Sequence, residues 1–187
     1  MTAVFKVARV LLIVGFLLLL PDAWAQKKYD PRSMAPYVPT PPEVVERMLE
    51  IAAVNSNDIV YDLGSGDGRI IIAAARKFGA RAVGVELDEE LAKQTAGRVR
   101  ELNIHDRVRV VQGNLLEVDL SPASVVTVYL LTSSNMKLRP RLEQSLKPGS
   151  RVVSHDFQIM GWTPVKTESF AGPGRTHTIY LYRVGKQ

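Results

Sequence analysis

Residues 58–68 constrain the fold more than any other part of this sequence. They read Asp-Ile-Val-Tyr-Asp-Leu-Gly-Ser-Gly-Asp-Gly, so an apolar run ends at Asp62 and glycines follow at positions 64, 66 and 68. The pattern predicts a buried parallel strand that runs into a loop where the backbone turns sharply and comes close to a ligand. Glycine permits both, because it tolerates positive φ and has no Cβ to clash.

An acidic residue closes the next strand-like run. Residues 81–86 end on Glu86, where an α/β protein places the carboxylate that binds ribose hydroxyls. A dinucleotide-binding loop requires Gly or Ala three residues after Gly66, and this chain has Arg69 there. Asp62, just before the loop, disfavours an anion and favours a ligand with a positive centre. The alternative is a glycine-rich loop in some other kind of α/β protein.

Strand-like and helix-like segments alternate along the rest of the chain. Thr40 is predicted to cap a helix that begins at Pro41, with Glu43 at the capping-box position. Further strands are predicted at residues 107–112, 125–131 and 151–157, and a hairpin at 163–168 and 177–183. Helices are predicted at 68–78, at 136–146, and from a cap at Asp88 to about residue 102. Alternating βα units predict an α/β fold with a mostly parallel seven-stranded sheet, helices on both faces and a C-terminal antiparallel hairpin.

The N-terminal segment has the composition of a targeting sequence. Lys6 and Arg9 precede an apolar run over residues 10–20, and Ala23-Trp24-Ala25 follows it. The run is shorter than the roughly 20 apolar residues that span a bilayer, so residues 1–25 are predicted to be a cleaved signal peptide and the protein to be exported, periplasmic or secreted. The alternative is an uncleaved membrane anchor. Residues 26–39 form a polar, proline-rich lead-in to one domain, 40–187.

Composition excludes several classes of site. The chain contains no cysteine, which excludes disulfides, thiolate metal sites and cysteine nucleophiles. No metal-ligand spacing is present, so no metal is expected. The net charge is +5, and the basic residues are scattered among acidic ones rather than gathered in a stripe with aromatic residues. Nucleic acid is therefore not expected as a partner.

The glycine-rich segment D-L-G-S-G-D-G-R, residues 62–69, resembles motif I of the class I S-adenosylmethionine (SAM)-dependent methyltransferases. Other segments narrow the resemblance: A-P-Y-V-P-T at 35–40, Y-L-L at 129–131, L-R-P at 138–140 and S-H-D-F at 154–157. They are similar to the small protein-lysine methyltransferases that modify the adenine nucleotide translocase and the ATP synthase c-subunit, and to bacterial relatives. The similarity covers about residues 35–160 and implies the Rossmann-like methyltransferase fold.

The resemblance implies SAM as the cofactor and a set of residues around it. Tyr37 and Thr40 would fold over its methionine moiety, Asp62 would engage its amino group, and Glu86 would hold both ribose hydroxyls. The implied cofactor-binding residues are Tyr37, Thr40, Asp62, Gly64, Ser65, Gly66, Asp67, Gly68, Glu86, Leu87, Asn114 and Leu115. Asn114 stands where the family usually has Asp, although its amide oxygen can also accept a hydrogen bond from adenine. Asp67 has an equal alternative as a turn or capping residue.

Tyr129 and Asn135 are the implied catalytic residues. Tyr129 would wall the methyl-transfer channel, and its alternative is an ordinary core aromatic. Residues 132–134 read Thr-Ser-Ser ahead of Asn135, where the family has Pro and Glu, so the substrate-facing region departs from the pattern. His155 and Asp156 are either a base with its orienting acid or a structural hydrogen-bonded pair.

The resemblance implies a protein-lysine N-methyltransferase, acting by in-line methyl transfer to a deprotonated lysine amine. The substrate would then be a protein, with membrane-associated proteins among the candidates. Two alternatives remain: a small-molecule methyltransferase and a non-catalytic SAM-fold binding protein. The N-P-P-[YF] motif of enzymes that methylate adenine or glutamine nitrogen is absent.

Overall fold

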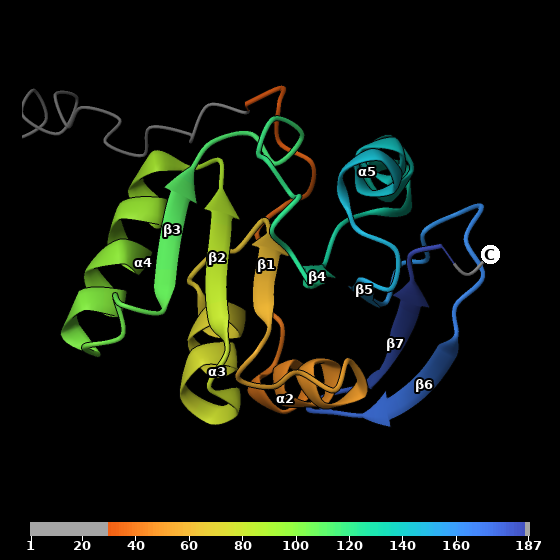
Figure 1. The fold of residues 1–187 in the computed structure, drawn as a ribbon, viewed down its shortest axis with the longest axis horizontal. Helices are drawn as coiled ribbons and strands as arrows, with labels where there is room; N and C mark the ends of the chain where they lie inside the picture. The colour runs from red at the N-terminus through yellow and green to blue at the C-terminus, as the bar shows by residue number, and fades with distance from the viewer. Residues whose placement is uncertain (1–29, 186–187) are drawn as a thin grey trace, which may run out of the picture. The chain divides into compact units, whose positions relative to one another are not determined.

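A computed structural model describes residues 30–185 as one seven-stranded mixed sheet with helices packed on it (Figure 1). The predicted signal peptide, residues 1–25, and the first part of the lead-in lie outside this range. The elements are α2 Pro42–Ile51, β1 Ile59–Leu63, α3 Arg69–Phe78, β2 Arg81–Glu86, α4 Glu89–Glu101, β3 Val108–Gln112, β4 Val125–Val128, α5 Thr132–Ser145, β5 Arg151–His155, β6 Lys166–Ala171 and β7 Thr176–Arg183. The predicted α/β architecture is confirmed.

The strands lie in the order β3-β2-β1-β4-β5-β7-β6 (Figure 1). The first five pair in parallel, and β7 and β6 add an antiparallel edge, as the hairpin pattern predicts. The chain runs outward from β1 to β3 on one side and from β4 to β5 on the other. This change of direction between β1 and β4 is where open α/β sheets bind ligands, beyond the carboxyl ends of their strands.

Helices bury both faces of the sheet. Val60 of β1 belongs to a core cluster with residues of α2, α3 and α4, whereas Tyr61 and Leu63 belong to a second cluster that includes Leu138 and Leu142 of α5. Successive strand residues point to opposite faces, so β1 contributes to both cores, which explains its nearly continuous apolar character. Within residues 30–185, no helix combines the length and apolar character needed to cross a membrane.

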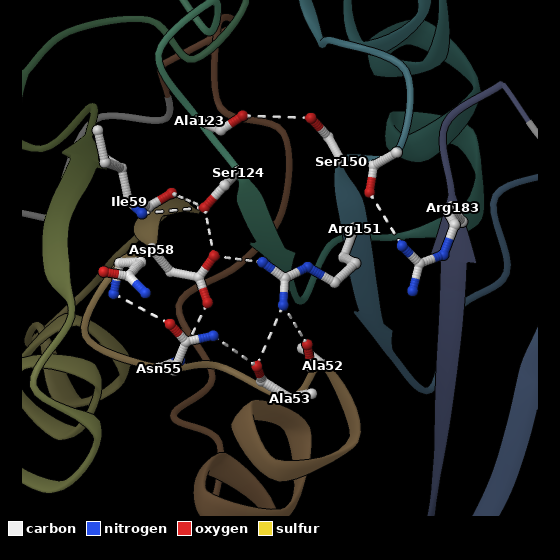
Figure 2. Close-up of polar contacts among 12 residues, drawn as sticks. Ala52, Ala53, Asn55, Asp58, Ile59, Ala123, Ser124, Ser150, Arg151 and Arg183 are labelled. Atoms are coloured by element: carbon white, nitrogen blue, oxygen red, sulfur yellow. Dashed lines mark hydrogen bonds and ion pairs between the residues drawn. The ribbon is translucent and has the colours of Figure 1, made fainter.

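A buried polar network fixes the amino ends of the strands (Figure 2). The Asp58 carboxylate pairs with the Arg151 guanidinium, accepts a hydrogen bond from the Ser124 hydroxyl at 2.7 Å, and accepts another from the Asn55 backbone N–H at 2.9 Å. Arg151 also donates to the carbonyl of Ala52, the C-cap residue of α2, at 2.7 Å. The network ties β1, β4 and β5 to one helix end.

Thr40 does not cap the first described helix, so that prediction is wrong. The N-cap residue of α2 is Pro41, without a side-chain cap, and the Thr40 hydroxyl instead lies 3.2 Å from Nδ1 of the buried His155. A cap at Thr40 would need backbone N–H donors just inside the helix. Pro42 removes the donor at the second helical position, and the Thr40 hydroxyl contacts His155 instead of the Glu43 N–H at the third.

Several predicted element bounds also differ. β4 ends at Val128 and α5 begins at Thr132, not at residues 131 and 136, because the backbone N–H groups of Ser134 and Asn135 both donate to the Leu131 carbonyl at 2.9 Å. β5 ends at His155, because Asp156 adopts a φ of 59° that no strand continues through. The hairpin strand β6 lies at Lys166–Ala171, three residues beyond the predicted 163–168.

Candidate functional site

The glycine-rich loop follows β1 at the carboxyl edge of the sheet. Gly64, Gly66 and Gly68 have φ values of 86°, 52° and 75°, in the left-handed region that glycine tolerates best. A Cβ at Gly66 would lie only 2.6 Å from Cε2 of Tyr37, so this position requires glycine for close approach as well as for conformation. The lead-in segment therefore lies directly against the loop.

Glu86 ends β2 and holds the loop from the neighbouring strand. One carboxylate oxygen accepts a hydrogen bond from the Gly66 backbone N–H at 2.8 Å, and the other accepts from the Asp88 N–H at 2.9 Å. Each oxygen keeps acceptor capacity after one such bond. The half-buried carboxylate is thus held in place with free lone pairs, as binding of two ribose hydroxyls would require. Its ribose contact stays a prediction.

Asp62 is a buried carboxyl group at the end of β1. It is 3% exposed and accepts a hydrogen bond from the Thr127 hydroxyl at 2.8 Å. Burial raises the pKa of Asp62 to about 7, the Thr127 hydrogen bond opposes that rise, and the nearby Glu86 adds to it. A cationic group placed beside Asp62 would favour its ionised form. The buried Ser65 hydroxyl has no hydrogen-bond partner among the described residues. These groups fit the amino-acid and ribose portions of SAM.

Arg69 links Thr40, the residue that follows the lead-in, to the glycine-rich loop, a role not predicted from the sequence. Its guanidinium donates to the Thr40 carbonyl at 2.7 Å and to both carboxylate oxygens of Asp67, at 2.9 and 2.6 Å. Asp67 is therefore a partner of Arg69, and the N-cap position of α3 falls to Gly68. The visible indication was the arginine itself, which stands where a dinucleotide loop would have Gly or Ala.

The predicted adenine-side residues lie at the ends of β2 and β3. Leu87 follows β2, and its carbonyl accepts a hydrogen bond from the Gln112 amide at 3.1 Å. Leu115 is buried. The Asn114 side chain is engaged in its own turn: its oxygen accepts from the Leu116 N–H at 3.0 Å, and its nitrogen donates to Glu117 at 2.9 Å. Adenine contacts for all three residues stay predictions.

Tyr129 follows β4 and faces the end of β5. Its ring centroid lies 3.9 Å from that of His155 and 6.1 Å from that of Phe157. His155 is fully buried, with Nδ1 near the Thr40 hydroxyl and Nε2 2.9 Å from Nδ1 of His177. Burial lowers the pKa of His155 to about 4, which keeps the imidazole neutral at pH 7. Both ring nitrogens are engaged, which favours the structural interpretation of His155.

Asp156 and Arg175 lie next to Tyr129 and His155. The Asp156 carboxylate pairs with the Arg175 guanidinium, which also lies 3.2 Å from the Tyr129 hydroxyl. His155, Asp156 and His177 place one ligand-type atom each within 4.8 Å of one another, a set that could hold a metal ion. The hydrogen bond between the two histidines and the Arg175 ion pair account for the cluster without one. The absence of a metal stays a prediction.

Asn135, the second implied catalytic residue, is buried in α5. Its amide nitrogen donates to the Phe157 carbonyl at 3.1 Å, which holds the chain just after β5. Its side-chain oxygen has no hydrogen-bond partner in the described part of the chain. The contacts seen here are structural, and a catalytic role for Asn135 stays a prediction.

Comparisons with known proteins agree with this geometry. The family model of the ANTKMT methyltransferase domain matches residues 62–166. A protein-lysine N-methyltransferase of Saccharolobus islandicus is 51% identical over 152 residues, which cover 81% of this chain and 94% of that protein. The human lysine N-methyltransferase of the ATP synthase c-subunit is 33% identical over 129 residues, 69% of this chain and 54% of that protein.

A solved structure shares both fold and sequence with the chain. The crystal structure of an RNA methyltransferase from Salinibacter ruber, in complex with S-adenosyl-L-homocysteine (SAH), has a TM-score of 0.76 and 49% identity, covering 80% of this chain and 95% of that one. The B. subtilis tRNA methyltransferase TrmK has a TM-score of 0.66 at 12% identity, which shows a shared fold alone.

Proposed function

Since this chain belongs to the ANTKMT methyltransferase family, we propose that it transfers the methyl group of SAM to the side-chain amine of a lysine in a protein. The protein is a SAM-dependent methyltransferase. The proposal of a lysine acceptor rests on the 51% identity with a protein-lysine N-methyltransferase, across 94% of that relative. The surroundings of Tyr129 support it, because an aromatic, half-buried wall suits the apolar stem of a lysine.

The residues of the site position the reactants and exclude water. Bound SAM supplies a methyl group already activated by the sulfonium, so alignment and desolvation are the main tasks left to the protein. In this proposal Asp62 fixes the amino group of SAM and Glu86 fixes its ribose. The lysine amine must lose a proton first, because its ordinary pKa is about 10.4. The amine releases this proton to solvent, and its lone pair then forms the N–C bond as the C–S electron pair returns to sulfur.

RNA is the second candidate acceptor, favoured by the structural relative from Salinibacter ruber. The charges at the proposed acceptor side oppose it. The Arg175 guanidinium beside Tyr129 is paired with the Asp156 carboxylate, which reduces its attraction for a phosphate backbone. The chain also lacks the N-P-P-[YF] motif of adenine-modifying enzymes.

Label transfer separates the two acceptors. The purified protein would be incubated with methyl-labelled SAM and a cell extract, and the labelled material treated with protease or ribonuclease. We expect a protease-sensitive, ribonuclease-resistant label that mass spectrometry assigns to the Nε atom of lysine, with none from a Glu86→Ala control. A ribonuclease-sensitive label would overturn the proposal in favour of RNA, and a labelled small molecule would overturn it in favour of a metabolite acceptor.

Export is a separate proposal that rests on the sequence of residues 1–25. We expect cleavage after Ala25 and a mature chain that begins at Gln26. N-terminal sequencing of the expressed protein, combined with cell fractionation, tests this. An intact chain that begins at Met1 in the membrane fraction would support the anchor alternative instead.

A further inference from the structure

Three segments that are distant in the sequence place a cation between a hydroxyl and a carboxylate. Tyr129 follows β4, Asp156 follows β5, and Arg175 precedes β7. One terminal nitrogen of the Arg175 guanidinium, Nη2, contacts both other side chains: it lies 3.2 Å from the Tyr129 hydroxyl and forms an ion pair with Oδ2 of Asp156. At the position of this nitrogen, two hydrogen-bond acceptors therefore contact one positive charge.

Asp156 is fixed independently of Arg175. Its backbone N–H donates to the Thr178 carbonyl at 2.7 Å, and its Oδ1 accepts from the Thr178 N–H at 2.9 Å. These bonds to β7 hold a non-glycine residue at a φ of 59°, a conformation that costs energy and is enriched at functional sites. The bonds to Thr178 therefore direct Oδ2 toward the Tyr129 hydroxyl without help from Arg175.

The walls around this point suit the stem of an alkylamine. The Tyr129 and Phe157 rings lie 6.1 Å apart between centroids, and aromatic faces pack well against methylene groups and attract a nearby cation. His155 contacts the Tyr129 ring and is neutral at pH 7, so it does not repel a positive charge. The groups next to the point thus include the fixed Asp156 carboxylate, the Tyr129 hydroxyl, aromatic surface, and the His155 imidazole, whose Nε2 lies 3.3 Å from Oδ2 of Asp156.

Arg175 is much more exposed to solvent than Asp156. Its side chain is 49% exposed, whereas that of Asp156 is 15% exposed. An ion pair with one solvent-exposed member contributes little to stability, so Arg175 can leave at small cost. We propose that Tyr129 and Asp156 form a subsite for a primary alkylammonium group, which Arg175 occupies in this structure and which the acceptor lysine takes during binding.

This inference rests on the proposed lysine acceptor and adds the residues that capture it. The carboxylate favours the protonated amine, so the subsite recognises lysine in the form that predominates at pH 7. Transfer requires the neutral amine, so Asp156 acts on substrate binding rather than on the methyl-transfer step. Its removal should consequently raise KM for the lysine substrate more than it lowers kcat.

Two readouts test the subsite. The first is n-butylammonium binding to the SAH-loaded protein, followed by NMR. The second is methyl transfer to a lysine peptide with KM and kcat measured separately. The variants are Asp156→Asn, which keeps an oxygen for the Thr178 N–H and tolerates positive φ, and Arg175→Ala. Arg107→Ala is the matched control, because Arg107 is similarly exposed at 52% and also paired with an aspartate, Asp106.

We expect Asp156→Asn to weaken n-butylammonium binding and raise KM by about tenfold, as loss of a charge-assisted hydrogen bond predicts. Arg175→Ala should tighten n-butylammonium binding and lower KM. The double variant Asp156→Asn/Arg175→Ala should lose that gain, and Arg107→Ala should change neither quantity. Unchanged n-butylammonium binding in Asp156→Asn, or weaker binding in Arg175→Ala, would overturn the subsite. Asp156-dependent n-butylammonium binding without transfer to any lysine would uphold the subsite and overturn the proposed acceptor.

Discussion

The two ends of the parallel sheet treat buried polar groups in opposite ways. At the amino ends, Asp58 meets Arg151, Ser124 and a backbone N–H, so the buried charge is fully paired (Figure 2). At the carboxyl ends, burial raises the pKa of Asp62 to about 7, and the Ser65 hydroxyl is buried without a partner among the described residues. The polar groups at the amino ends stabilise the fold, whereas those at the carboxyl ends cost free energy that a bound ligand can offset.

Breaking the amino-end network should have the largest effect on stability. Arg151→Met leaves the Asp58 carboxylate buried without its cation, which should lower the free energy of unfolding by about 3–5 kcal/mol. Urea denaturation measures the loss, with the exposed Arg107→Met as control. SAH affinity of the folded variant should stay at the wild-type value. A large loss of affinity with little loss of stability would contradict the division between the two ends.

Acid should destabilise the protein through His155. Its folded-state pKa of about 4 lies below the ordinary value of 6.5, so its stabilising contribution is complete above pH 6.5 and is lost as pH falls through 4. The full effect is of order 3 kcal/mol. On going from pH 7 to pH 4.5, the urea midpoint should move to lower values in the wild type and in His105→Gln than in His155→Gln, because the raised pKa of Asp62 opposes the fall equally in all three proteins. An equal pH dependence in all three proteins would show that His155 is not responsible.

Asp62 should make cofactor binding depend on pH. Because a cationic amino group requires the carboxylate form and the pKa is about 7, SAH affinity should rise roughly eightfold from pH 6 to pH 7.5. Calorimetry in buffers of different ionisation enthalpy should also detect proton release on binding at pH 6. Asp62→Asn should bind more weakly and lose this pH dependence. A wild-type slope retained in Asp62→Asn would assign the titration to another group.

The smallest effect on SAH binding is expected from a substitution in the lead-in, Tyr37→Ala. Tyr37 lies against Gly66 but is 56% exposed, so Tyr37→Ala should weaken SAH binding about threefold, a fraction of the burial energy of an aromatic side chain. Val38→Ala is a matched control, because Val38 is its neighbour and is 53% exposed. Equal effects of the two substitutions would show that the lead-in acts only as a linker.

Local patterns predicted most of the fold. The spacing of glycines at 64, 66 and 68 and the acid at the end of β2 depend on a few neighbouring residues, and the structure places both at the same edge of the sheet. The Asp88 cap of α4 is confirmed for the same reason, since its carboxylate accepts from the Leu91 N–H three residues on. Such features follow from chain geometry alone.

Contacts across long sequence separations could not be predicted in this way. Thr40 satisfies the capping pattern, yet its hydroxyl contacts His155, 115 residues away. No local pattern marks Arg69 as a partner of Thr40 or Arg175 as a partner of Tyr129, because these contacts form only when distant segments lie beside the strand ends. Tertiary hydrogen bonds override local propensity at these positions.

The proposed SAM site depends most directly on Glu86 as a ligand of the cofactor ribose. Calorimetric titration of SAH into the wild type and Glu86→Ala tests this, with the exposed Glu89→Ala as control. Loss of a charge-assisted acceptor for two hydroxyls should cost about 1.5–3 kcal/mol of binding, a loss of tenfold or more in affinity. We expect this loss in Glu86→Ala alone. Wild-type affinity in a folded Glu86→Ala protein would contradict the placement of SAM at the carboxyl ends of the strands.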